Sequence, residues 1–190
     1  MSEAPTRLCG DAEMQEILGL ADADTMAGVA AIDQALISYP GDSRLHFLKG
    51  SMLIGEKRFI AAHSALTLAV QHDPDFHLAR FQLGFFELTS GEAATALATW
   101  QPLHALPPEN FLRIFVDGLE HLIADRFEAC IASLNSGISC NTENVPLNND
   151  MQLIISRCEE LLGQSGSASG DSDGAVSATS LLLGAKRRPS

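Results

Sequence analysis

The sequence repeats a pattern of small and large apolar residues every 34 positions, and this spacing restricts the fold more than any other feature. Three kinds of position keep the register: a glycine, a small residue and a large apolar residue. They are Gly50, Gly84 and Gly118; Ala62, Ala96 and Cys130; and Leu66, Trp100 and Leu134. A period of a few tens of residues is typical of repeat proteins, in which each unit stacks on its neighbours. We therefore expect a repeat architecture.

The repeating pattern resembles the tetratricopeptide repeat, a helix–turn–helix unit with small residues at two fixed positions. The resemblance covers three consecutive units across 43–144, namely 43–76, 77–110 and 111–144. It implies an all-α fold, an α-solenoid of antiparallel helix pairs. An earlier, degenerate unit is expected in 1–42, because Pro40 continues the register of the later prolines. This unit has Glu16 where the family has glycine and Gly28 where it has alanine.

The small residues have a physical role in such a stack of helices. Gly84 and Ala96 would allow two helices to approach closely, and Trp100 would fill the volume beside them. Gly91 is expected in the turn between two helices, where a positive φ costs glycine little. Pro102 lies within the predicted second helix of the same unit, so we expect that helix to kink or to end early.

A capping helix is predicted after the third unit, in residues 145–163. Its apolar residues form an amphipathic stripe, Asn149 and Gln152 give a capping-box pattern near its start, and Gly163 is expected to end it. Residues 164–190 are rich in glycine and serine, so a disordered tail is predicted there. The tail ends in the apolar and basic sequence LLLGAKRRPS.

The chain carries a formal net charge of −12, which argues against binding to nucleic acid or to anionic membranes. No N-terminal segment has the pattern of a signal peptide, and no apolar run is long enough to span a membrane. The four cysteines, Cys9, Cys130, Cys140 and Cys158, have no CxxC spacing, and we interpret them as free thiols with Cys130 buried. These features predict a cytoplasmic protein.

Enzyme motifs are absent from the sequence, so we expect no enzyme and no catalytic, cofactor-binding or metal-binding residues. None of the six histidines has HExxH spacing or the cysteine-paired spacing of a zinc site. The glycine motifs of phosphate-binding loops, nucleophile elbows and dinucleotide-binding folds are also missing. Asp117, His121 and Asp125 lie on or near one predicted helix, and we interpret them as a solvated face.

The tetratricopeptide resemblance implies a binding groove, because the first helix of each unit lines the concave surface in that family. The matching positions are almost all apolar here, so the cations needed to clamp a terminal carboxylate are missing except for Arg44. The predicted groove residues are Phe47, Ile54, Leu78, Phe81, Phe85, Leu88, Leu112, Phe115, Leu119 and Leu122. An apolar groove favours a protein or peptide partner that presents an apolar or amphipathic segment.

We therefore predict a protein–protein interaction adaptor or a chaperone-like protein, a class that includes export-type chaperones masking apolar substrates. Acidic residues on the surface would steer basic partners toward it. The chain's own C-terminal tail is a second candidate occupant of the groove. The alternatives are a structural subunit that self-associates through its apolar face, and groove residues that are ordinary core. The oligomeric state stays open.

Overall fold

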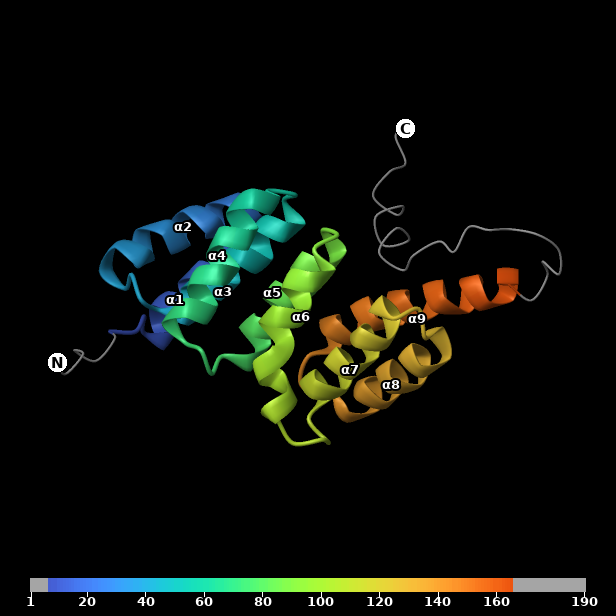
Figure 1. Ribbon diagram of the computed structural model, residues 1–190. Coiled ribbons are helices and arrows are strands. Elements are labelled where there is room, and N and C mark those ends of the chain that lie inside the picture. Colours follow the sequence, from blue (N-terminus) through green and yellow to red (C-terminus); the bar gives the residue numbers. More distant parts are fainter. Residues whose placement is uncertain (1–6, 166–190) are drawn as a thin grey trace. The chain divides into compact units, whose positions relative to one another are not determined.

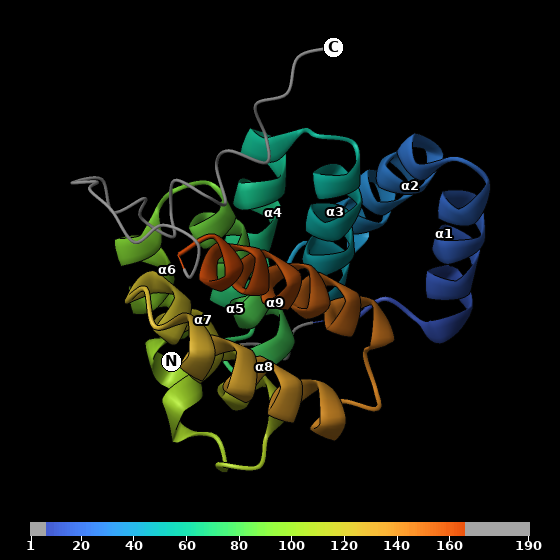
Figure 2. The same ribbon diagram turned by 90° about the vertical axis from the view of Figure 1, so that its right-hand side faces the viewer.

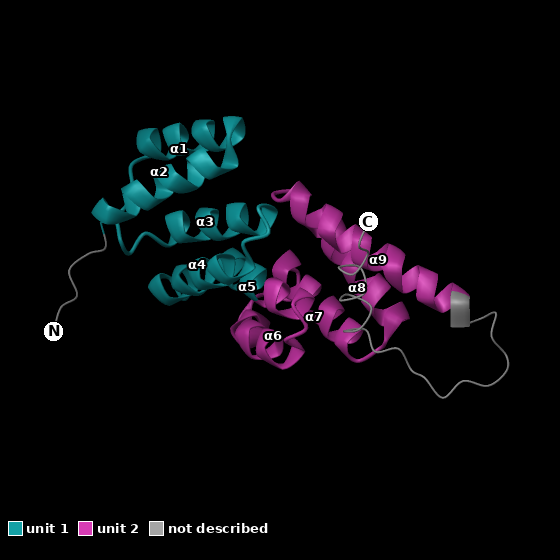
Figure 3. Cartoon of the chain, turned by 90° about the horizontal axis from the view of Figure 1, so that it is seen from above, with its two compact units in different colours: residues 1–83 teal, residues 84–190 magenta. Residues whose placement is uncertain are grey.

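The computed structural model describes residues 7–165, with side chains described as far as Gly163. This part of the chain is all-α (Figure 1). Its helices are α1 (Asp11–Ala23), α2 (Thr25–Ser38), α3 (Ser43–Gly55), α4 (Phe59–His72), α5 (His77–Thr89), α6 (Ala93–Trp100), the 3₁₀ helix η1 (Gln101–Ala105), α7 (Phe111–Ile123), α8 (Phe127–Cys140) and α9 (Val145–Ser165). Two compact units divide the chain, Met1–Leu83 (unit 1) and Gly84–Ser190 (unit 2), with the boundary inside α5 (Figure 3).

The helix boundaries repeat with the predicted period of 34 residues. The helices α3, α5 and α7 begin one period apart, at the first residues of the three predicted units, and α4, α6 and α8 also begin one period apart. Even α2, in the degenerate unit, begins one period before α4. Consecutive helices pack as pairs, among them α1 with α2, α3 with α4, and α7 with α8. The predicted fold class, an all-α helical repeat, is confirmed.

The turn between the two helices of each unit has one recurring backbone geometry. Lys57, Gly91 and Asp125, each one period apart, have φ angles of 58°, 93° and 55°. In every case the next residue donates its backbone N–H to a carbonyl five residues earlier, with an N–O distance of 2.9 Å. Such a left-handed turn satisfies carbonyl groups at the end of the first helix. The predicted turn conformation of Gly91 is confirmed, and two residues with side chains adopt it as well.

The repeated glycines lie where two helices come closest. A Cβ atom added to Gly84 would overlap the Trp100 indole, and the equivalent glycines of the other two units would meet Leu66 and Leu134 at 2.7 Å. All three large partners are fully buried. The predicted close approach at Gly84, opposite Trp100, is therefore confirmed, and the structure shows the same contact in the other two repeats.

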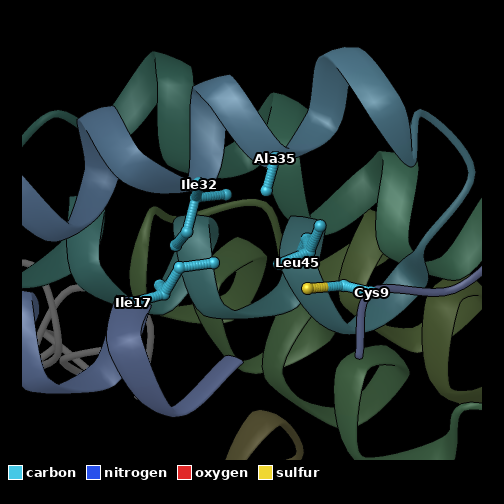
Figure 4. Close-up of a cluster of buried hydrophobic side chains, with 5 residues drawn as sticks. All are labelled: Cys9, Ile17, Ile32, Ala35 and Leu45. Atoms are coloured by element: carbon cyan, nitrogen blue, oxygen red, sulfur yellow. The ribbon is translucent and has the colours of Figure 1, made fainter. Parts of the chain in front are cut away.

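The N-terminal pair, α1 with α2, packs through a different small residue. Gly28 in α2 lies against Ala21 in α1, and an added Cβ atom would come within 2.8 Å of the Ala21 Cα atom. Glycine at this position therefore permits a close approach of the degenerate unit's own two helices, and Glu16 stays exposed. The same two helices contribute Ile17, Ile32 and Ala35 to a cluster of buried apolar side chains, drawn in Figure 4, which Cys9 and Leu45 complete.

The middle unit has a shortened second helix, as Pro102 predicts. The α-helix α6 ends at Trp100, and the next five residues form η1 instead. Proline lacks a backbone N–H and its ring crowds the preceding turn, so α-helical hydrogen bonding stops there. The chain then reaches Asn110, whose side-chain oxygen accepts the N–H of Leu112 at 3.0 Å and caps α7.

The predicted capping helix is α9, which packs beside α8 (Figure 2). It begins where expected, but the predicted N-cap Asn149 is wrong because this residue lies inside the helix. The side-chain oxygen of Asn144 accepts the N–H of Leu147 at 3.2 Å instead. The helix continues to Ser165, beyond its expected end, and the rest of the predicted tail lies outside the described residues. Neither α9 nor any other helix of residues 7–165 has the length and apolar character needed to cross a membrane.

Candidate functional site

The predicted groove residues fall into two groups in the structure. Six are buried and belong to the core: Phe81, Leu88, Leu112, Phe115, Leu119 and Leu122. Four are half-buried: Phe47, Ile54, Leu78 and Phe85. A partner needs accessible atoms, so among the predicted groove residues only the second group can contribute to an apolar binding surface.

The helix α7 shows why so many of these positions are core. Phe115, on its apolar face, packs against α8, where a Cβ atom added to Gly137 would lie 2.5 Å from the phenylalanine ring. Phe111 meets the same ring edge-on, with ring centroids 5.9 Å apart. The helix α7, the first helix of the third 34-residue repeat, thus uses its predicted groove positions for packing inside unit 2.

In unit 1, α3 keeps part of the predicted groove accessible. Phe47 and Ile54 are seven residues apart, so they share one face of the helix. The Phe47 ring packs against Phe76, with ring centroids 5.1 Å apart, and Ile54 lies at the edge of the buried cluster around Leu53. All three of these edge residues are half-buried. We refer to Phe47, Ile54 and Phe76 as the α3 apolar face.

Arg44, the only cation among the family's groove positions here, has a structural role. Its guanidinium donates to the two carboxylate oxygens of Asp42 at 3.0 and 2.8 Å, and to the Cys9 carbonyl at 2.7 Å. Asp42 is fully buried and also accepts the backbone N–H of Cys9 at 2.8 Å. Burial raises the pKa of Asp42, but these hydrogen bonds outweigh it and hold the pKa below its usual value. Arg44 therefore fastens the chain before α1 to the start of α3.

A separate group of polar side chains comes together in unit 2, where η1 meets α7. His104 in η1 lies between two carboxylates of α7: its Nε2 is 2.9 Å from Glu120 Oε1, and its Nδ1 is 3.6 Å from Asp117 Oδ1. All three side chains are half-buried. One donor atom from each lies within 4.8 Å of the others, a spacing compatible with a bound metal ion. We refer to these three residues as the His104 cluster.

Sequence reasoning missed the His104 cluster. It grouped Asp117 with His121 and Asp125 on one helix, whereas Asp117 pairs with His104, and Asp125 lies in the left-handed turn after α7. The signal that could have found the cluster is the repeat register. His104 and Glu120 occupy positions that Leu36 and Met52 fill two periods earlier, so a comparison of the repeats pairs them.

Two buried thiols also lie together in unit 2. The Sγ atoms of Cys130 in α8 and Cys158 in α9 are 3.9 Å apart. The hydrogen bond with Cys158, together with burial, raises the pKa of the Cys130 thiol, which makes it a poor nucleophile. All four cysteines are free thiols and Cys130 is buried, as predicted.

No protein-family model matches this chain, and a search of the curated proteins finds no match either. The helical repeat therefore rests on the helix boundaries, turns and glycine contacts described above. Membership of the tetratricopeptide family stays a proposal.

Proposed function

We propose that this chain binds another protein through the α3 apolar face, as an adaptor or chaperone-like protein of the tetratricopeptide class. The observation that supports this most is the half-exposed pair Phe47 and Ile54 on the first helix of a regular helix pair. The fitting partner is a protein segment that presents apolar side chains at helical or extended spacing.

The surrounding unit supplies a rigid base for such contacts. The large apolar residues on the inner side of α3 and α4, namely Leu45, Leu53 and Leu66, are fully buried. Phe47 and Ile54 lie at the edge of this packing and keep accessible apolar surface. Covering apolar surface is favourable by about 25 cal/mol per Å². A partner with two apolar anchors would therefore gain free energy here without any rearrangement of the core.

The net charge of the chain favours one kind of apolar segment over others. At −12, the chain attracts segments that carry lysine or arginine beside their apolar anchors. Such attraction raises the association rate and the specificity of binding. We therefore propose a basic amphipathic segment as the partner, and its binding should weaken as salt is added.

The test compares two isoleucines of unit 1, each changed to aspartate. Ile54→Asp alters the α3 apolar face, whereas Ile60→Asp alters α4 at a side chain that is 89% exposed. Proteins retained from the host cell by the wild type and by each variant are quantified by mass spectrometry. The bound segment is then measured directly by titration calorimetry, and circular dichroism confirms that both variants keep their helices.

We expect a basic amphipathic segment that binds the wild type and Ile60→Asp equally. Its dissociation constant should rise by about tenfold or more with Ile54→Asp, since a charge placed in an apolar contact costs about 1.4 kcal/mol or more. Equal binding by the two variants would contradict the proposed surface.

Self-association is a distinct outcome of the same variants. If sedimentation velocity finds a wild-type dimer that Ile54→Asp dissociates, and no segment binds, then the chain is a structural subunit and not an adaptor. The chain's own tail is tested by deleting residues 164–190. Tighter binding of the segment after deletion would identify the tail as a competitor for the α3 apolar face.

A further inference from the structure

We propose that the His104 cluster binds a divalent transition-metal ion, and that Zn²⁺ fits its donor atoms best. The site would consist of His104 from η1 with Asp117 and Glu120 from α7. It lies within unit 2 and does not depend on the proposed partner binding, which we assign to unit 1.

The spacing of the donor atoms is close to that around a coordinated ion. Zinc binds imidazole nitrogen and carboxylate oxygen at about 2.0–2.2 Å, so two such donors on one ion lie roughly 3–3.5 Å apart. His104 lies 2.9 Å from Glu120 and 3.6 Å from Asp117. A rotation of the imidazole ring would present one nitrogen to an ion held by both carboxylates.

The three donors are held by two separate elements. Asp117 and Glu120 are three residues apart, and this spacing places both side chains on the same side of α7. His104 approaches them from η1. Donors fixed on helices keep their geometry better than donors on a loop, so the cluster is largely formed before an ion binds.

The cluster has two carboxylates and no permanent positive charge. Among the described residues, the ion pairs of Asp117 and Glu120 are those with His104, and neither carboxylate meets a lysine or an arginine. Residues 84–163 contain eleven acidic and three basic side chains. A divalent cation would neutralise two carboxylates that otherwise share one imidazole.

A comparison with unit 1 indicates that helix packing does not require these polar residues. Two periods earlier, the positions of His104 and Glu120 are occupied by Leu36 and Met52. Both of these residues pack against the same apolar cluster. In unit 2, polar side chains therefore replace apolar side chains that pack between the helices in unit 1. Departures of this kind from the regular pattern are expected at functional sites.

The donor set also limits the class of ion. Imidazole nitrogen suits zinc, copper, iron and nickel, whereas calcium and magnesium prefer oxygen donors alone. Three protein ligands leave a coordination position for water, and the half-buried side chains of the cluster leave water a path to it. A bound ion would fasten η1 to α7, and we infer no reaction at it.

The test is isothermal titration calorimetry, in which the full chain is titrated with Zn²⁺ in a non-coordinating buffer. His104→Ala removes the nitrogen donor, and Glu120→Gln removes one carboxylate while keeping the shape of the side chain. His63→Ala is the matched control, because His63 is an exposed histidine on α4, outside the cluster. Circular dichroism checks the fold of each variant.

We expect one Zn²⁺ ion per chain in the wild type and in the His63→Ala control. Either cluster variant should weaken binding by more than the roughly 10-fold that follows loss of a partner outside the coordination sphere. Zn²⁺ should raise the Tm of the wild type and leave that of His104→Ala unchanged. Absence of Zn²⁺ binding in the wild type, or wild-type Zn²⁺ affinity in either cluster variant, would overturn the proposal.

Cobalt(II) distinguishes the His104 cluster from the cysteines as the metal site. A Co²⁺ spectrum without a thiolate charge-transfer band, lost in Glu120→Gln, supports the cluster. A thiolate band would place the ion on a cysteine, such as the exposed Cys140, and would overturn the proposal. If His104→Ala loses helix, Glu120→Gln still decides, because it replaces one oxygen with an amide nitrogen.

Discussion

Two equivalent positions of the repeat carry apolar side chains in unit 1 and polar side chains in unit 2. In unit 1, Leu36 and Met52 pack against a buried apolar cluster. In unit 2, their counterparts His104 and Glu120 pair with each other at 2.9 Å, beside a further carboxylate. Because a repeat provides similar backbone at equivalent positions, this difference isolates what the side chains and the local chain path contribute.

The difference in side chains accompanies a difference in the length of the second helix of each 34-residue repeat. This helix has 14 residues in both α4 and α8 but only 8 in α6, where Pro102 starts the change to η1. Pro102 thus lies at the change from α-helix to η1, just before the polar position His104. The interruption of the helix and the polar side chains occur together in one repeat, whereas the uninterrupted α2 has Leu36 at the equivalent position.

The largest effect is expected at the residue that ends α6. Trp100 is fully buried against Gly84, so Trp100→Ala should lower the free energy of unfolding by about 3–5 kcal/mol. Leu97→Ala, on the same helix but 36% exposed, should cost less than about 1.5 kcal/mol. Urea unfolding measures both variants. Similar losses would contradict the claim that the glycine–tryptophan contact holds the shortened helix.

The turns between helices offer a second comparison, with a smaller effect. Gly91→Ala should destabilise the chain by about 1 kcal/mol, because a Cβ atom disfavours a positive φ. Lys57→Gly, at the equivalent turn of the preceding unit, should stabilise the chain by a similar amount for the same reason. Urea unfolding checks the signs. Two changes of the same sign would show that side-chain contacts, and not backbone conformation, decide stability in these turns.

Pro102→Ala would test whether the proline itself shortens α6 relative to α4 and α8. We expect α6 to extend into residues 101–105, with a change of less than about 1 kcal/mol in the free energy of unfolding. NMR chemical shifts should then become α-helical in this segment. Unchanged shifts would mean that packing on α7, and not Pro102, determines η1.

The smallest effect is expected from pH, and it should come from unit 1. His46 is buried, donates a hydrogen bond from Nε2 to the Pro40 carbonyl at 2.8 Å, and stacks on His72. Burial lowers the pKa of His46 below its ordinary value of 6.5. Below about pH 6.5, His46 therefore binds a proton in the unfolded chain but not in the folded chain, and the free energy of unfolding falls.

Urea unfolding of the wild type and of His46→Gln, at about pH 7.5 and about pH 5.5, measures this contribution. Above the ordinary pKa both states are neutral at His46, so the wild type loses nothing there. The variant should lose less stability on acidification than the wild type does. An equal loss in both proteins would exclude His46 as the source.

The fold could be predicted from the sequence because its determinants are local and recur. The turn at Gly91 and the early helix end at Pro102 follow from backbone preferences of single residues, and the glycines at fixed spacing mark a close helix contact that recurs in each repeat. The cap of α9 was placed wrongly because Asn144 and Asn149 are both good N-caps, and the sequence pattern does not reveal that Asn144 is also held by hydrogen bonds with the buried Asn141.

The candidate sites depend on features that a sequence pattern does not contain. Phe47 and Phe115 occupy the same position in their repeat units, yet one is half-buried and the other is fully buried against α8. His104 and Glu120 are 16 residues apart and belong to different elements, so no motif with short spacing joins them. Both outcomes depend on which surfaces neighbouring helices cover, and this is a property of the assembled fold.

X-ray absorption spectroscopy at the zinc edge of the Zn²⁺-loaded chain tests most directly whether unit 2 has a metal site where unit 1 has apolar packing. We predict one imidazole nitrogen and carboxylate or water oxygens at about 2.0–2.2 Å from the zinc ion, and loss of the imidazole signal in His104→Ala. A sulfur ligand at about 2.3 Å, or a chain that retains no zinc, would contradict this prediction.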